Sequence, residues 1–118
     1  MKRSFLNIAV WLAILTASGN ALADSVEAMC LDANKAPEVC DCAAARLAAE
    51  VGETDYALYE AVGAAYRENL AAGAGRGDAW DAAVKAVADQ NGAGATATLQ
   101  RTNGIGKAHR QAMKACAG

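Results

Sequence analysis

Residues that carry catalysis and metal binding are scarce in this sequence of 118 amino acids. It contains one histidine, one proline and one phenylalanine, and aromatic residues make up 5% of the chain. Beyond residue 23 the only serine is Ser25, so a serine nucleophile with a histidine base has few residues to draw on. The Cys-x-x-Cys of thioredoxin-like redox sites and the Cys-x-x-Cys-His of haem attachment are both absent. We therefore predict no catalytic residue, no metal or other cofactor, and no enzymatic activity.

Large apolar side chains are also few. Beyond residue 23, alanine occurs 27 times, whereas Val, Ile, Leu, Met, Trp and Tyr together occur 18 times. Such a chain buries little apolar area per residue, so its core needs covalent reinforcement. Tyr56, Tyr59, Tyr66 and Trp80 could line a ligand pocket, but because large residues are so few, we expect them to form the core itself.

Residues 1–23 have the pattern of a cleaved secretory signal peptide. Two basic residues precede an apolar run from Phe5 to Ala17, and the segment ends in Ala21-Leu22-Ala23, an A-x-A cleavage site. The run is shorter than the about 20 apolar residues of a spanning helix, so a retained anchor is the less favoured alternative. We expect cleavage to leave one domain, residues 24–118, that is periplasmic or secreted and makes no stable membrane insertion.

Apolar residues spaced three to four apart predict an all-α fold, a small bundle of four to five short helices cross-linked by two disulfides. No alternating pattern typical of a strand is found. The helices are expected from Asp24 or Ser25 to about Ala33, from Pro37 to Val51, from a cap at Thr54 or Asp55 to Gly73, from a cap at Asp78 to Asn91, and from about Thr96 onward. Because Asn103-Gly104 and Gly106 interrupt the last segment, it is predicted to form two short helices rather than one bent helix.

Four cysteines in a short exported chain predict a disulfide framework. Cys40 and Cys42 are two positions apart on a helix, so their side chains point about 200° apart and do not easily bond to each other. A turn at residues 34–36 brings Cys30 opposite Cys40, which favours Cys30–Cys40 with Cys42–Cys116. The swapped map, Cys30–Cys42 with Cys40–Cys116, is nearly as well supported and stays open. If reduced, the Cys-x-Cys would offer soft ligands for copper, an alternative that an oxidising compartment disfavours.

Asn103, Lys107, His109 and Arg110 lie in one short segment together with two glycines. Glycines that open a helix beside cations can present free N–H groups and positive charge to a phosphate or a carboxylate. The favoured interpretation is structural: the glycines allow close helix packing, and the cations pair with acidic residues. We expect His109 to be hydrogen-bonded between helices. Anion or ligand binding by these four residues is the alternative.

Charge divides the chain into an acidic body and a basic end. Two of the 11 basic residues and none of the 13 acidic residues precede residue 24, so cleavage leaves a net charge of −4. Residues 96–118 contain four basic residues and no acidic one. An acidic body repels phosphate backbones, so nucleic acid is not an expected partner.

These observations lead to a non-enzymatic, exported protein whose partner is another exported protein. The first hypothesis is a periplasmic protein-interaction module of the chaperone-like or the inhibitor and immunity type. The second is a small anion-binding or ligand-binding protein that uses residues 103–110. The third is a copper binder through the Cys-x-Cys.

Overall fold

A computed structural model describes residues 25–118; the predicted signal peptide, residues 1–23, lies outside the described residues. The described part of the chain contains helices and no strand, which confirms the predicted all-α bundle. Its five helices are α2 (Ser25–Asp32), α3 (Pro37–Val51), α4 (Glu53–Ala71), α5 (Arg76–Gln90) and α6 (Ala95–Ala117).

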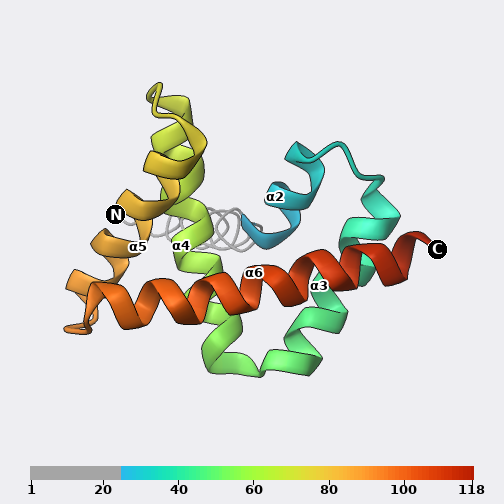
Figure 1. Cartoon of the computed structure of the whole chain (residues 1–118). Coiled ribbons are helices and arrows are strands. Elements are labelled where there is room, and N and C mark those ends of the chain that lie inside the picture. The colour runs from blue at the N-terminus through green and yellow to red at the C-terminus, as the bar shows by residue number, and fades with distance from the viewer. Residues whose placement is uncertain (1–24) are drawn as a thin grey trace, which may run out of the picture.

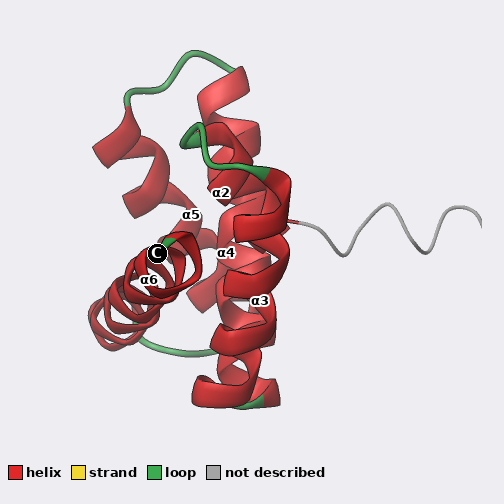
Figure 2. Cartoon of the chain, turned by 90° about the vertical axis from the view of Figure 1, so that its right-hand side faces the viewer, coloured by secondary structure: helices red, strands yellow, loops and turns green. Residues whose placement is uncertain are grey.

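The long helix α6 holds the bundle together (Figure 1). Its carboxyl-terminal half lies along α3, and its amino-terminal half contacts the α4–α5 pair, whose two helices run in opposite directions. The short helix α2 packs on α3 and α4. Seen from the side in Figure 2, α3 stands next to the carboxyl-terminal end of α6. Every other helix therefore lies close to α6 or to a direct neighbour of α6.

Two helices begin earlier than the predicted caps, so the cap predictions are wrong. Helix α4 starts at Glu53 rather than after Thr54 or Asp55, because Gly52 alone joins it to α3 with a φ of 88°, a left-handed backbone that glycine adopts at low cost. Helix α5 starts at Arg76, ahead of Asp78. Asp55 and Asp78 instead lie in first turns, where a carboxylate still interacts favourably with the helix dipole.

Helix α6 runs unbroken through both of its internal glycines, so the prediction of two short helices is wrong. Each glycine costs up to about 1 kcal/mol of helix stability relative to alanine. The cost is offset by packing, because Thr102, Ile105 and His109 are all buried on the face that α6 presents to the bundle. Tertiary contact thus overrides the local signal for a helix end.

The core consists of two adjoining apolar clusters. The first joins α2, α3, α4 and α6 through Val26, Leu47, Tyr59 and Ile105, and the second joins α4 and α5 through Val62, Ala83, Val84 and Val87. Trp80 packs against both clusters. Alanines are buried at several helix contacts, so the helices approach one another closely with little apolar volume between them.

The two disulfides follow the favoured map, Cys30–Cys40 and Cys42–Cys116, which the structure confirms. The first joins α2 to α3 across 10 residues with both cysteines buried, and the second joins α3 to the last turn of α6 across 74 residues. The described residues contain no free cysteine, so a thiolate copper site would require reduction of these bonds. Two disulfides fit an oxidising, extracytoplasmic compartment.

Among residues 25–118, none of the helices combines the length and the apolar character that crossing a membrane requires.

Candidate functional site

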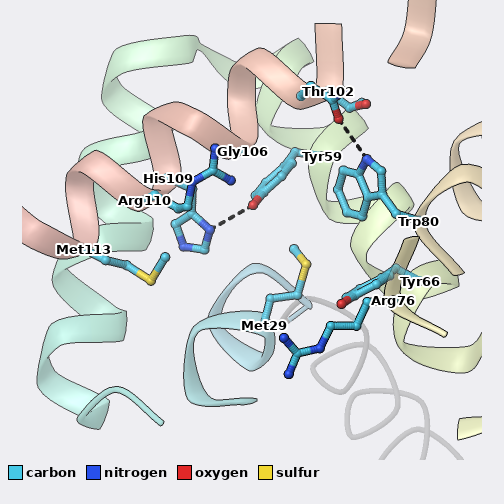
Figure 3. A pocket seen from close by; sticks show the side chains of 11 residues that line it. Met29, Tyr59, Tyr66, Arg76, Trp80, Thr102, Gly106, His109, Arg110 and Met113 are labelled. Carbon is cyan, nitrogen blue, oxygen red and sulfur yellow. Dashed lines mark hydrogen bonds between the residues drawn. The ribbon is translucent and has the colours of Figure 1, made fainter. Parts of the chain in front are cut away.

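A pocket of about 370 Å³ opens between α2, α4, α5 and α6 (Figure 3). Its lining combines aromatic rings and thioethers with a small set of polar side chains. The lining residues are Met29, Tyr59, Tyr66, Arg76, Trp80, Thr102, Asn103, Gly106, His109, Arg110 and Met113.

Trp80 is fixed in the pocket wall by its neighbours. Its ring meets those of Tyr59 and Tyr66 edge to face, with centroid distances of 6.1 and 5.4 Å, and its Nε1–H donates to Asn103 Oδ1 at 3.0 Å. Such edge-to-face pairs are favourable because the positive edge of one ring meets the negative face of the other. The aromatic residues therefore do both things considered from the sequence: Tyr56 and Tyr59 pack in the core, while Tyr59, Tyr66 and Trp80 line the pocket.

Met29 reaches the pocket because α4 carries a glycine beneath it. A Cβ atom added at Gly63 would lie 2.5 Å from Met29 Cε and 3.1 Å from Met29 Sδ. Ser25, in the same helix, donates its hydroxyl hydrogen to the backbone carbonyl of Glu60 at 2.5 Å, which fixes the start of α2 on α4. The absence of a side chain at Gly63 thus sets how closely α2 approaches the pocket.

A buried pair, Tyr59 and His109, forms the floor of the pocket. The Tyr59 hydroxyl lies 2.9 Å from His109 Nδ1, and both side chains are at least 95% buried. His109 Nε2 is also buried and has no hydrogen-bond partner among the described residues. The expectation that His109 is hydrogen-bonded between helices is confirmed, but only for one of its two nitrogens.

The lack of a partner at His109 Nε2 indicates which residue donates in the Tyr59–His109 hydrogen bond. If Tyr59 O–H donates to Nδ1, the imidazole carries its proton on Nε2, and one buried group lacks a partner. If Nδ1–H donated instead, both the tyrosine proton and Nε2 would lack partners, at a cost of about 1–3 kcal/mol for each. The first arrangement is favoured, so Nε2–H is a buried donor without an acceptor.

Burial keeps both members of the pair uncharged at neutral pH. It raises the pKa of Tyr59 to about 12, against the opposing effect of the positive charge on Arg110. Burial, assisted by the same charge, lowers the pKa of His109 below its usual value. A neutral imidazole and a protonated phenol therefore face the pocket.

Two arginines provide the charge of the pocket. Arg76 from α5 and Arg110 from α6 line it, and among residues 25–118 no aspartate or glutamate does. Both side chains are exposed, so they stand at the mouth of the pocket, and neither forms an ion pair with a described residue. By contrast Arg101, which lies on α6 like Arg110, pairs with Asp55 of α4, with Arg101 Nε 2.7 Å from Asp55 Oδ1.

The structure brings together three of the four residues predicted for anion or ligand binding. Asn103, His109 and Arg110 line the pocket, whereas Lys107 is exposed and does not. Sequence reasoning missed Met29 and Arg76, which come from other helices. Arg76 stood in a Gly-Arg-Gly turn, and no periodicity marks which way such a side chain points.

Comparison of the chain with models of protein families, with curated proteins and with solved structures found no match.

Proposed function

We propose that this protein is a non-enzymatic, exported binding protein of the periplasm that holds a small molecule in the pocket between α2, α4, α5 and α6. The observation that carries the proposal is the pocket itself. Its volume of about 370 Å³ falls within the roughly 300–1,000 Å³ of small-molecule sites. Its lining, apolar and aromatic with a few convergent polar groups, is also typical of such sites.

The covalent framework supports the proposed location. Both disulfides need an oxidising compartment to form and persist, and residues 1–23 have the pattern of an export signal. The same framework supports a preformed pocket, since α2, α3 and α6, two of which contribute lining residues, are bonded to one another.

The lining favours binding over catalysis. Among its described lining residues His109 is the one neutral base, and the hydroxyl bonded to it is that of Tyr59, whose raised pKa makes it a poor nucleophile. The first hypothesis from the sequence, a protein-interaction module, stays a prediction. Among the described residues Leu31 is the one large apolar side chain that is exposed. The described surface therefore has no apolar patch of the kind that would support a protein-docking role.

A fluorescent probe tests occupancy of the pocket. Anilinonaphthalene sulfonate, titrated into protein purified from the periplasmic fraction, should saturate at one site per chain. It should also accept excitation energy from Trp80, the one tryptophan left after the predicted cleavage. The energy transfer should disappear in Trp80→Phe.

Two leucine variants on the same helix give a matched control. Gly106 lines the pocket, and a Cβ added there would lie 3.8 Å from the Tyr59 ring, so Gly106→Leu should fill the cavity and abolish binding. At Gly104 an added Cβ meets nothing within 4 Å, so Gly104→Leu should bind as the wild type does. Unsaturable binding, or equal binding by both folded variants, would show that the pocket is not the site.

A further inference from the structure

The charge of the pocket is opposite to that of the chain. After the predicted cleavage the chain has an excess of acidic residues, yet the charged residues that residues 25–118 contribute to the lining are Arg76 and Arg110. Figure 3 shows them on different sides of the cavity, Arg110 on α6 and Arg76 near Met29 and Tyr66. A cation entering this pocket would be repelled from both sides, whereas an anion would be attracted by both.

A buried hydrogen-bond donor beside the cavity lacks an acceptor. His109 Nε2–H has no partner within the described residues, and Figure 3 shows the imidazole between Tyr59 and Met113, all of which line the pocket. The atom has less than 1 Å² of accessible surface, so an occupant reaches it only if a neighbouring side chain moves. Met113 is such a neighbour, and methionine has three rotatable bonds.

The rest of the lining suits an apolar body. The rings of Tyr66 and Trp80 and the thioethers of Met29 and Met113 supply polarizable surface without charge. Thioethers alone would also attract a soft metal ion, but the two guanidinium groups at the mouth oppose a cation. The pocket is therefore apolar along its walls, positive at its mouth and short of a hydrogen-bond acceptor.

Resting on the proposed function, we infer that the occupant is a small organic anion: a carboxylate, or a chemically similar oxyanion, attached to an aromatic or alkyl body. Its charge is placed by Arg110 and Arg76 at the mouth, and its body lies against Trp80 and Tyr66. A second oxygen on the body of such a ligand would supply the acceptor that His109 Nε2–H lacks. Discrimination against the neutral analogue comes from the arginines.

Paired probes of equal shape separate charge from fit. Phenylacetate with phenylacetamide, and hexanoate with hexanamide, differ within each pair chiefly in charge. Isothermal titration of the protein purified from the periplasmic fraction should give about fivefold tighter binding for each carboxylate, the effect expected of partly exposed charges. The preference should shrink as sodium chloride is raised, because salt screens exposed charges, while amide binding stays constant.

A double variant locates the source of the preference. In Arg76→Gln with Arg110→Gln, carboxylate and amide should bind equally. The control, Lys107→Gln with Lys114→Gln, changes the net charge by the same amount on exposed residues outside the lining, and it should keep the preference.

The outcomes separate this inference from the proposed function. Equal binding of acid and amide to the wild type, or a preference that survives loss of both pocket arginines, overturns the anion assignment but leaves a binding pocket. A preference lost equally in the lysine control overturns it too, since general charge would then explain the effect. If no probe and no anilinonaphthalene sulfonate binds, the proposed function itself fails.

Discussion

The two ends of this bundle are stabilised in different ways. At one end α2, α3 and the carboxyl-terminal part of α6 are joined by both disulfides. At the other end α4, α5 and the amino-terminal part of α6 hold together by packing of valines, alanines and the Tyr66–Trp80 pair. The first end is held by covalent bonds. The second end is held by noncovalent contacts, which break and re-form cooperatively during local unfolding.

The pocket lies where the two ends meet. Met29 and Met113 come from the disulfide-linked end, whereas Tyr66, Arg76 and Trp80 come from the end that is held by packing alone. A binding site built across such a boundary has one rigid wall and one adjustable wall. We therefore predict that local unfolding of α4 and α5 limits the affinity of the pocket for its occupant.

The largest effect is expected from removal of the long disulfide. Replacing Cys42 and Cys116 with alanine should lower the free energy of unfolding by about 4 kcal/mol, compared with about 3 kcal/mol for alanine at Cys30 and Cys40, because the longer loop restricts the unfolded chain more. Urea denaturation of both double variants measures the difference. Equal losses would mean that loop length does not govern the stability of this end.

A cavity in the other end should cost about 2 kcal/mol. Val84 is buried between α4 and α5, and Val84→Ala removes two methyl groups from that contact. Amide hydrogen exchange should then accelerate in α4 and α5 and remain nearly unchanged in α3. If α3 accelerates equally, the two ends unfold as one unit and the comparison is wrong.

The helix shared by both ends can be stabilised by one substitution. Gly104 is exposed within α6, and an added Cβ meets no atom within 4 Å, so Gly104→Ala should raise the free energy of unfolding by about 1 kcal/mol. Thermal denaturation should show a higher midpoint. A lower midpoint would reveal that the glycine is needed for a local backbone adjustment rather than tolerated.

The smallest effect concerns pH. Because the pKa of His109 is lowered in the folded state, the unfolded chain binds a proton there more readily as the pH falls below the ordinary histidine value of about 6.5. Stability should be complete above that pH and decline below it, until the pH passes the folded pKa. The free energies of unfolding of wild type and His109→Gln, measured by denaturation, should change with pH in the same way above pH 6.5. Below pH 6.5 their pH dependence should differ.

Sequence reasoning predicted the features of this molecule that depend on residues close together in the chain. The helix positions followed from the spacing of apolar residues, and the favoured disulfide map followed from a single turn between Cys30 and Cys40. The continuity of α6 was missed, because burial of Ile105 and His109 outweighs the cost of two glycines.

The pocket was only partly predictable for a similar reason. Asn103, His109 and Arg110 were found because they are close in sequence, whereas Met29 and Arg76 join them only through the packing of α2 and α5. The unpartnered nitrogen of His109 could not be foreseen, since it depends on which of its two nitrogens Tyr59 contacts.

If the chain is exported amino terminus first, as its signal-peptide pattern predicts, the separation of 74 residues between Cys42 and Cys116 would impose an order of events on disulfide formation. On this proposed route Cys30, Cys40 and Cys42 would reach the oxidising compartment before Cys116, so Cys42 would at first lack its native partner. During that interval Cys30 can bond to Cys42 instead of Cys40, and such an error is corrected only by thiol–disulfide exchange. The yield of native protein should therefore depend on the isomerase capacity of the compartment more than on its oxidising power.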